Sequence, residues 1–357
     1  MNTQWGGLLA RLDVGVAVFF VLSGFLLSRP HVHAWLTGKP RPAVRRYVRH
    51  RVLRIAPPLW ITVALVALLV PESRARGEDL ILHTALVQIY AGVLDVEGLT
   101  QMWSLATEVS FYIVLPLIAA AVFRGPATTA RVNRLLAGLS VTPLVGAAWM
   151  AWATSEGGGR TTWLPGFVGW FGLGIAIALW RSARQEGLIA ESWLDQVSRR
   201  SGTCWALAAA LLWLSASRAF GPHDLALYSS TEAAAKNLTF AVIGALLLLP
   251  CVALPHDHRT DTGVAFLSSR GATWLGDISY GIFCYHLVIL LMVEKALDYQ
   301  LFTGNYFALF VPTVLVSIGV AAASFYGVER PLMRWGRRNE TPSPPRTATA
   351  MTKTASS

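Results

Sequence analysis

Residues 14–27 read VGVAVFFVLSGFLL, and residues 39–54 read KPRPAVRRYVRHRVLR; these two stretches decide the fold. The first contains no charged side chain, whereas the second is dense in arginine. An apolar run that ends at a cluster of fixed positive charge is typical of a transmembrane helix that reaches the cytoplasmic side. A new apolar run opens at Pro57 and Pro58, so the chain is predicted to re-enter the membrane there.

The composition predicts an all-α, polytopic membrane protein. The chain has 357 residues, of which 54% are hydrophobic and 14% are charged, and its mean hydropathy is +0.48. Soluble domains carry roughly a quarter charged residues, so too little polar surface is left to face water. The net charge of +10 is concentrated in short loops. That distribution favours membrane lipid head groups or a cytoplasmic anionic ligand as partners, and it argues against nucleic acid.

Nine segments are apolar and long enough to be predicted as membrane spans, since a span needs roughly 17–25 mostly apolar residues. Segment 80–94 is shorter and contains polar side chains, so we predict that it is re-entrant or interfacial. Residues 1–338 are predicted to form one transmembrane domain, and residues 339–357 a disordered cytoplasmic tail rich in Pro, Ser and Thr. The nine predicted spans are 12–28, 55–71, 103–123, 134–153, 163–180, 203–219, 237–254, 272–293 and 306–328.

The distribution of lysine and arginine predicts the orientation in the inner (plasma) membrane. If loop 29–54 is cytoplasmic, the inner segments hold 23 of the 30 Lys and Arg residues, and the C-terminus is cytoplasmic. Nine spans then place the N-terminus outside, with only about a dozen residues before the first span. The simplest expectation is a further helix upstream, which gives ten spans with both ends inside.

Neither the cysteines nor the histidines predict a metal site. Cys204, Cys251 and Cys284 lie in apolar stretches without ligand spacing, so they are predicted to be buried free thiols. His31 and His33 flank Val32 without further ligands nearby in the sequence. We therefore expect no metal cofactor.

The basic block contains the first candidate binding residues. Arg51 and Arg54 lie one helical turn apart, and the basic surface is extended by Arg45, Arg46 and Arg49. Guanidinium groups bind phosphates in a bidentate manner and stack on flat rings. Such a cluster suits a phosphorylated cytoplasmic donor, such as a nucleotide or coenzyme A. The alternative is a topology signal that also anchors the chain to lipid.

Glu108 is the first candidate catalytic residue. It lies in the segment WSLATEVSFYIVLP, residues 103–116, within the third predicted span. A carboxylate inside a membrane helix is costly and usually functional. It could orient a catalytic group, accept a proton or hydrogen-bond a sugar hydroxyl. The alternative is a structural partner for an arginine or for a backbone group.

His286 is the second candidate catalytic residue. It lies in LGDISYGIFCYHLVIL, residues 275–290, about two turns from the outer end of its span. An imidazole there could act as a general base for a hydroxyl nucleophile. The alternative is a histidine that hydrogen-bonds between helices.

Small residues in two of the spans predict close helix packing. Ser23 and Gly24 in VLSGF lack the second glycine of a nucleophile elbow, so we interpret them as a helix contact. The fifth span has the same character, with Gly166, Gly169, Gly172 and Gly174.

Taken together, these segments resemble acyltransferase family 3, membrane proteins that O-acylate sugars. GVAVFFVLSGFLL is similar to the family's G-V-D-L-F-F-V-L-S-G-F pattern, and RHRVLRIAPPLW to its R-x-x-R followed by proline and an aromatic residue. WSLATEVSFYIVLP resembles the W-S-L-x-x-E-x-x-F-Y block, LGDISYGIFCYHLVIL the G-x-x-S-Y-x-x-Y-x-x-H segment, and FYGVERPLMRW the closing E-x-P. The five matches follow the family's order and span most of the chain.

The resemblance implies a ten-helix fold, acyl coenzyme A (acetyl-CoA in the expected case) as co-substrate, and a hydroxyl acceptor on a carbohydrate or glycosylated metabolite. By motif position, Arg51 and Arg54 take the donor-side role and Glu108 the acidic role. Two features depart from the family pattern. Ala17 stands where the family commonly has Asp, and no histidine precedes His31, whereas the family's first helix carries an arginine followed about ten residues later by a histidine. The resemblance thus implies a relative without its first helix.

Two other functions are compatible with the sequence. A transporter or flippase would share the spans and the intramembrane charges, but it predicts inverted repeats, and the sequence shows no such symmetry. A catalytically inactive relative that acts as a scaffold is the second alternative, because the helix expected to carry the main base is missing.

Overall fold

The computed structural model describes residues 4–70, 75–222, 226–253, 262–299 and 306–338. These residues form helices and no strand, which confirms the all-α prediction for the described part of the chain. The predicted disordered tail, 339–357, lies outside the described residues. The longer helices are α2 (Val14–Thr37), α3 (Val44–Leu69), α6 (Met102–Val122), α7 (Thr129–Ser140), α8 (Thr142–Ser155), α9 (Val168–Gln185), α11 (Ser201–Ser215), α12 (Ser230–Leu248), α14 (Arg270–Ala296) and α15 (Tyr306–Ser324). The shorter ones are α1 (Gln4–Leu9), α4 (Gly77–Thr84), α5 (Gln88–Ala91), α10 (Trp193–Ser198), α13 (Thr262–Leu267) and α16 (Arg330–Arg338).

Eight helical segments of the described chain are long and apolar enough to cross a membrane, so the protein is a multi-pass membrane protein. They correspond to eight of the nine predicted spans: Gly7–Thr37, Val44–Leu69, Met102–Val122, Thr129–Ser155, Leu164–Gln185, Ser230–Val252, Arg270–Ala296 and Tyr306–Arg338. The ninth, 203–219, corresponds to α11, which has 15 residues. At about 1.5 Å per residue, α11 is shorter than the hydrocarbon thickness of roughly 30 Å.

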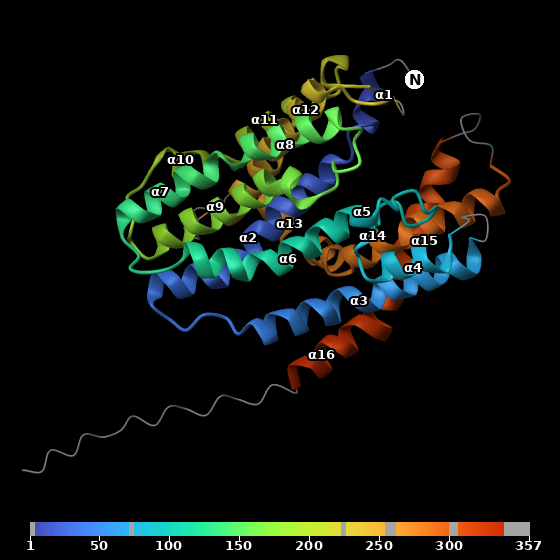
Figure 1. Cartoon of the computed structure of the whole chain (residues 1–357), viewed down its shortest axis with the longest axis horizontal. Helices are drawn as coiled ribbons and strands as arrows, with labels where there is room; N and C mark the ends of the chain where they lie inside the picture. The colour runs from blue at the N-terminus through green and yellow to red at the C-terminus, as the bar shows by residue number, and fades with distance from the viewer. Residues whose placement is uncertain (1–3, 71–74, 223–225, 254–261, 300–305, 339–357) are drawn as a thin grey trace, which may run out of the picture.

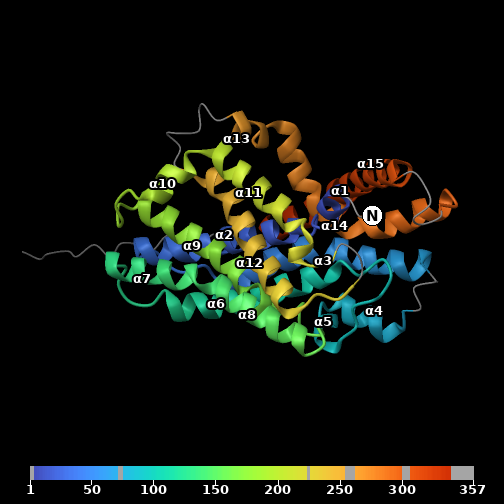
Figure 2. The ribbon, with the colours of Figure 1, turned by 90° about the horizontal axis from the view of Figure 1, so that it is seen from above.

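The helices form two groups that meet at α6. The core group consists of α2, α8, α9, α11 and α12, with α2 packed against α9 and α12. The peripheral group consists of α3, α14, α15 and α16, with α14 between α3 and α15 and with α16 against α3. Figures 1 and 2 show the core group around α2 and the peripheral group on the side of α3 and α15. Helix α6 packs on α2.

Glycines allow the backbones of the core group to approach closely. A Cβ atom added at Gly24 of α2 would collide with the carbonyl of Phe171, and one added at Gly174 of α9 would collide with the carbonyl of Val21. Gly169 and Gly172 abut Pro143 and Thr142 at the start of α8 in the same way. The predicted close packing is therefore confirmed, since small residues are what lets membrane helices pack backbone to backbone.

Segment 80–94 is a pair of short helices, α4 and α5, and not a span. They are separated at Leu86, which has a positive φ of 57°. The prediction that this segment does not cross the membrane as a full helix is confirmed.

Most of the basic block is helical. Helix α2 runs on to Thr37 and ends at Gly38, whose φ of 66° is the left-handed conformation that closes many helices. Helix α3 begins at Val44, so the connection spans only residues 38–43. Pro57 and Pro58 lie inside α3 without ending it. Segment 29–54 therefore consists of the end of α2, this connection and the start of α3, with Arg51 and Arg54 on one helix as predicted.

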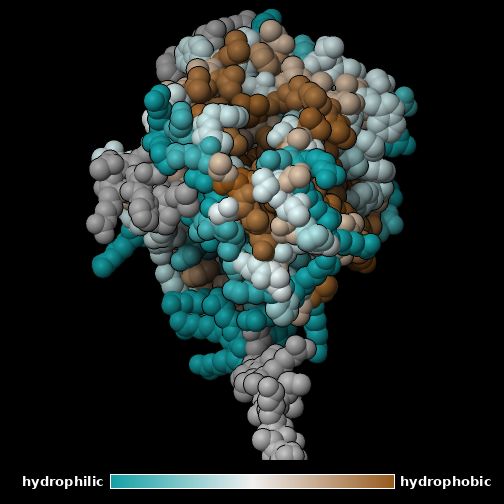
Figure 3. All heavy atoms as spheres, turned by 90° about the vertical axis from the view of Figure 1, so that its left-hand side faces the viewer, coloured by the Kyte–Doolittle hydropathy of each residue, from teal (hydrophilic) through white to brown (hydrophobic). Residues whose placement is uncertain are grey.

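Figure 3 looks onto the end of the molecule that carries this connection. Hydrophilic side chains dominate the lower half of that face, and hydrophobic side chains gather in the upper half. Of the cysteines, Cys204 and Cys284 are buried as predicted. Cys251 is exposed, contrary to the prediction, because it follows α12 in a 3-10 turn that faces a groove instead of the bundle.

Candidate active site

Glu108 lies where the two helix groups meet. Its side chain is buried, with 2% of the residue exposed, although it carries an ionisable group within a membrane helix. The Ser23 hydroxyl, from α2, donates a 2.5 Å hydrogen bond to Glu108 Oε1. The Tyr112 hydroxyl, one turn further along α6, lies within hydrogen-bonding reach of the same carboxylate. Glu108 thus has two hydroxyl partners, as expected for a buried polar group.

The peripheral group brings arginines to the other side of this carboxylate. The Arg51 guanidinium lies over the ring of Tyr112, 5.4 Å from its centroid. Arg51 and Arg54 both interact electrostatically with Glu108. The structure therefore brings together the predicted donor-binding arginines and the predicted acidic residue, which are more than fifty positions apart in the sequence. This geometry is compatible with a catalytic role for Glu108 and with its alternative, a partner for an arginine.

Arg54 also interacts electrostatically with a second carboxylate, Glu329. Glu329 is buried, with 2% of the residue exposed, and closes the π-helical turn Phe325–Glu329 that links α15 to α16. Its Oε1 accepts a 3.2 Å hydrogen bond from Ser324. The closing E-x-P segment therefore belongs to the same cluster of charges as the basic block.

Sequence reasoning missed Tyr47 and gave little weight to His31. Tyr47 lies one turn before Arg51 on α3 and interacts electrostatically with Arg51 and Glu108. Its hydroxyl is buried and has no hydrogen-bond partner among the described residues. The ring of His31, which is buried on α2, lies edge-on to the Tyr47 ring at 6.3 Å. The spacing of residues 47, 51 and 54 could have identified Tyr47, because such positions share one helix face.

Helix α14 contributes Tyr280 to the same region. The Tyr280 hydroxyl donates a 2.8 Å hydrogen bond to the Ile55 carbonyl of α3, just before the two prolines. Tyr280 also interacts electrostatically with Glu108 and Tyr112. The tyrosine of the LGDISYG segment therefore connects α14 to the site.

His286, the second predicted catalytic residue, lies six positions further along α14. Its Nδ1 atom faces two carbonyls of its own helix, at 2.8 Å from Phe283 O and 3.2 Å from Ile282 O. Within the described chain, no interaction joins His286 to Glu108. His286 lies roughly 9 Å from Tyr280 along the helix axis, because an α-helix rises about 1.5 Å per residue.

A small basic cavity lies between α3 and α16. Its volume is about 150 Å³. Arg51 and Arg54 both line it, whereas Arg46, the third predicted donor-binding residue, is exposed elsewhere on α3. The lining residues are His50, Arg51, Leu53, Arg54, Met333 and Arg337.

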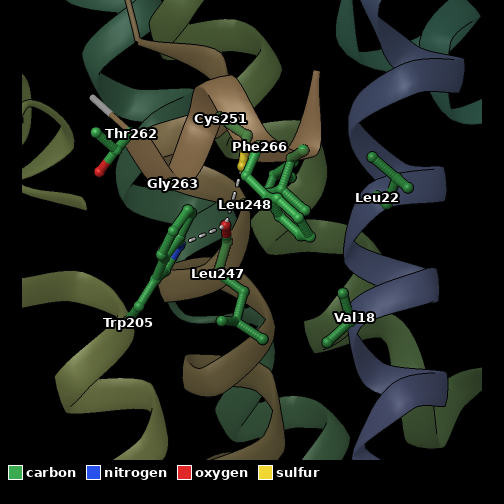
Figure 4. A pocket seen from close by; sticks show the side chains of 10 residues that line it. Val18, Leu22, Trp205, Leu247, Leu248, Cys251, Thr262, Gly263 and Phe266 are labelled. Atoms are coloured by element: carbon green, nitrogen blue, oxygen red, sulfur yellow. Dashed lines mark hydrogen bonds between the residues drawn. The ribbon is translucent and has the colours of Figure 1, made fainter. Parts of the chain in front are cut away.

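A larger groove of about 730 Å³ is apolar and lies between α2, α11, α12 and α13 (Figure 4). In it, the Trp205 indole and the Cys251 thiol donate hydrogen bonds of 3.4 and 3.5 Å to the Leu247 carbonyl. None of the lining residues is acidic or basic. This groove suits a hydrocarbon chain, because its lining is mostly apolar.

The part of the chain that the structure describes contains no group of three His, Cys, Asp or Glu residues placed to hold a metal ion. Of the two histidines near the basic block, His33 lies 3.7 Å from Glu186 Oε1, and His31 packs against Tyr47. The groups that the described residues place at the site are carboxylate, hydroxyl, guanidinium and imidazole groups.

Comparison with protein families finds a match to an acyltransferase domain over residues 3–322. That match covers nine-tenths of the chain and includes α2, α3, α6 and α14, which carry the site; it ends before α16. No curated protein matches the chain, and no solved structure matches it.

Proposed function

The chain belongs to acyltransferase family 3, and from that premise we propose that it is an integral membrane O-acyltransferase. It transfers an acyl group, with acetyl as the expected case, from acyl-CoA to a hydroxyl of a carbohydrate or glycosylated metabolite. The observation that carries the proposal is the buried Glu108 carboxylate, which accepts a hydrogen bond from Ser23 and lies beside Arg51. A carboxylate inside a membrane helix is costly and usually functional.

We assign Glu108 the role of general base. The hydrogen bond from the Ser23 hydroxyl supports this assignment, because it shows that the carboxylate accepts from a hydroxyl at 2.5 Å. An acceptor hydroxyl held in the same way would pass its proton to the carboxylate as its oxygen attacks the thioester carbonyl carbon. The C–S bond then breaks, the coenzyme A thiolate leaves, and the proton passes from Glu108 to that sulfur. Atoms and charge balance without a metal or a redox partner.

Arg51 and Arg54 bind the donor in this proposal. Arg51 lies over Tyr112, and both arginines line the small basic cavity beside Glu108. Guanidinium groups suit the phosphates of coenzyme A, and their positive charge also stabilises the oxyanion that develops on the thioester. Arg46 is exposed and belongs to the approach path for an anionic donor. Because acyl-CoA is cytoplasmic, the proposal includes an inner (plasma) membrane location with a cytoplasmic C-terminus.

His286 remains the second proposed catalytic residue, as an alternative base. Its Nδ1 faces the carbonyls of its own helix, so Nε2 is the atom that would accept a proton. The variants Glu108→Gln and His286→Asn separate the two roles. Loss of the general base typically lowers kcat about a hundredfold or more. We expect a loss of this size for Glu108→Gln and a smaller one for His286→Asn.

The test uses the full chain in lipid nanodiscs with acetyl-CoA labelled in the acetyl group. Acceptors are a panel of peptidoglycan fragments, lipopolysaccharide sugars, exported polysaccharide and macrolide glycosides, with products detected by mass spectrometry. Glu156→Gln, at an exposed glutamate between spans, is the matched control and is expected to keep wild-type activity. Labelled acetyl esters that need Glu108 support the proposal. No labelled product with any acceptor would overturn it, and uptake into vesicles without covalent product would indicate a transporter.

A further inference from the structure

The small basic cavity has walls from two helices that are distant in the sequence. Its arginines come from α3, with Arg51 and Arg54, and from α16, with Arg337. Arg337 follows the end of the family match at residue 322. The cavity is therefore partly built by a segment outside the matched acyltransferase domain.

Helix α16 is fixed against α3 immediately beside Arg337. A side-chain nitrogen of Arg49 donates a hydrogen bond to the Gly336 carbonyl. Gly336 itself is buried, and a Cβ atom there would collide with the Leu53 side chain. A glycine at this position allows the two helices to approach, and the approach places the next residue, Arg337, at the cavity.

The lining of the cavity favours an anion. Three of its six residues are arginines and one is His50, and none is acidic. Among the described residues, the carboxylates Glu108 and Glu329 both interact with Arg54. Two carboxylates facing three guanidinium groups leave net positive charge among the described residues around the cavity. Guanidinium forks bind phosphate oxygens through paired, charge-assisted hydrogen bonds.

The size of the cavity limits what it can hold. A volume of about 150 Å³ corresponds to about five waters at the density of the liquid. This room is sufficient for a phosphate or diphosphate group, and it is too small for a whole nucleotide. The remainder of such a ligand would extend beyond the cavity.

We propose that α3 and α16 form a phosphate-binding site that is completed by Arg337. The phosphate belongs to the acyl donor if the proposed function holds, and this part of the inference rests on that function. An anionic lipid head group offers the same chemistry from a second source. In either case α16 is part of the binding site, and α3 alone is not sufficient for full affinity.

The test measures binding, so it does not depend on acyl transfer. Inorganic pyrophosphate, coenzyme A and phosphate-free acetyl-pantetheine are titrated onto the full chain in nanodiscs of zwitterionic lipid. Arg337→Ala is expected to weaken pyrophosphate and coenzyme A binding about tenfold, as expected for one charge-assisted contact. Acetyl-pantetheine binding is expected to stay unchanged. Arg334→Ala and Arg338→Ala are the matched controls, because these arginines lie on α16 but do not line the cavity.

Each outcome has a defined meaning. Unchanged pyrophosphate binding in Arg337→Ala, in a variant with wild-type thermal stability, would overturn the site. If Arg337→Ala fails to fold, Arg337→Lys keeps the charge without the fork and is expected to weaken pyrophosphate binding less than tenfold but measurably. Pyrophosphate binding without coenzyme A binding would keep the site and refute the donor assignment. Nanodiscs with phosphatidylglycerol then test the lipid, which should compete with pyrophosphate only when Arg337 is present.

Discussion

The two helix groups each use a partly or fully buried arginine, and they use it differently. Arg11, which precedes α2 in the core group, is fully buried at 0% exposure. Its guanidinium donates hydrogen bonds of 2.6–3.1 Å to the Tyr228 hydroxyl and to the carbonyls of Ser215, Phe220, Gly221 and Pro222. Arg51, in the peripheral group, is only partly buried and lies between the Tyr112 ring, Glu108 and a cavity.

The difference separates structural from functional charge. The Arg11 guanidinium donates to carbonyls at the end of α11 and in the turn that follows, so it holds this region in place and is not directed at a ligand. A guanidinium that lines a cavity keeps donors that a ligand can use. Both sites place a cation among apolar helices, which is costly. The contacts of each arginine distinguish a structural role from a functional one. Four predictions test this comparison.

The largest effect is expected from Arg11→Ala. The substitution leaves four buried or partly buried carbonyls without this donor, and each buried group left unsatisfied costs about 1–3 kcal/mol. We expect a loss of several kcal/mol of stability and a strongly reduced yield of folded protein, measured as the unfolding midpoint in detergent. Arg134→Ala, at an exposed position on α7, is the matched control and should leave the midpoint unchanged. An Arg11→Ala protein as stable as the wild type would contradict the structural role.

The second prediction concerns Arg51→Ala. We expect at least a tenfold loss of acyl transfer, because one charge-assisted contact to the donor contributes about 1.5–3 kcal/mol. The unfolding midpoint should change by no more than a few degrees, since the arginine lies at a cavity. Arg45→Ala, at an exposed position on the same helix, controls for loss of charge in the basic block. If Arg51→Ala unfolds as readily as Arg11→Ala, the contrast between the two arginines is lost.

Much of the fold could be predicted from the sequence, because membrane spans depend on composition and length alone. Glu108 was a functional candidate because a carboxylate in a membrane helix is costly, and Arg51 because clustered guanidinium groups suit phosphates. Their proximity did not, because it depends on how α3 and α6 pack, and neither helix has a local signal for its partner. The basic cavity could not be predicted either. Arg337 comes from α16, and in the sequence it looks like another positive charge that sets membrane orientation.

The third prediction tests the close packing of the core group. Gly24→Ala places a methyl group against the Phe171 carbonyl, where it has no room. Overpacking of this kind costs about 1–3 kcal/mol, so the unfolding midpoint should fall. Gly138→Ala, on α7, meets no atom within 4 Å and should be neutral or slightly stabilising. A tolerant Gly24 would indicate that the core group is as loosely packed around its glycines as the periphery is around its cavity.

The smallest effect is expected from acidification, which leaves both arginines charged and changes the protonation of a buried histidine. His83 of α4, outside the spans, has 1% exposure, and its Nδ1 lies 2.8 Å from the Asp79 carbonyl. Burial lowers the pKa of His83 below its usual 6.5, although the contact with the Asp79 carbonyl opposes the shift. The unfolded chain therefore binds the proton more readily, and stability should fall as the pH drops below about 6.5. His83→Asn should show a shallower decline in unfolding midpoint between pH 7 and 5, whereas an equal decline in both proteins would place the titrating group elsewhere. Asp195 loses its charge only at lower pH. Burial raises the pKa of Asp195, but hydrogen bonds from Arg184 and Ser192 lower it more, so the pKa stays below its usual value.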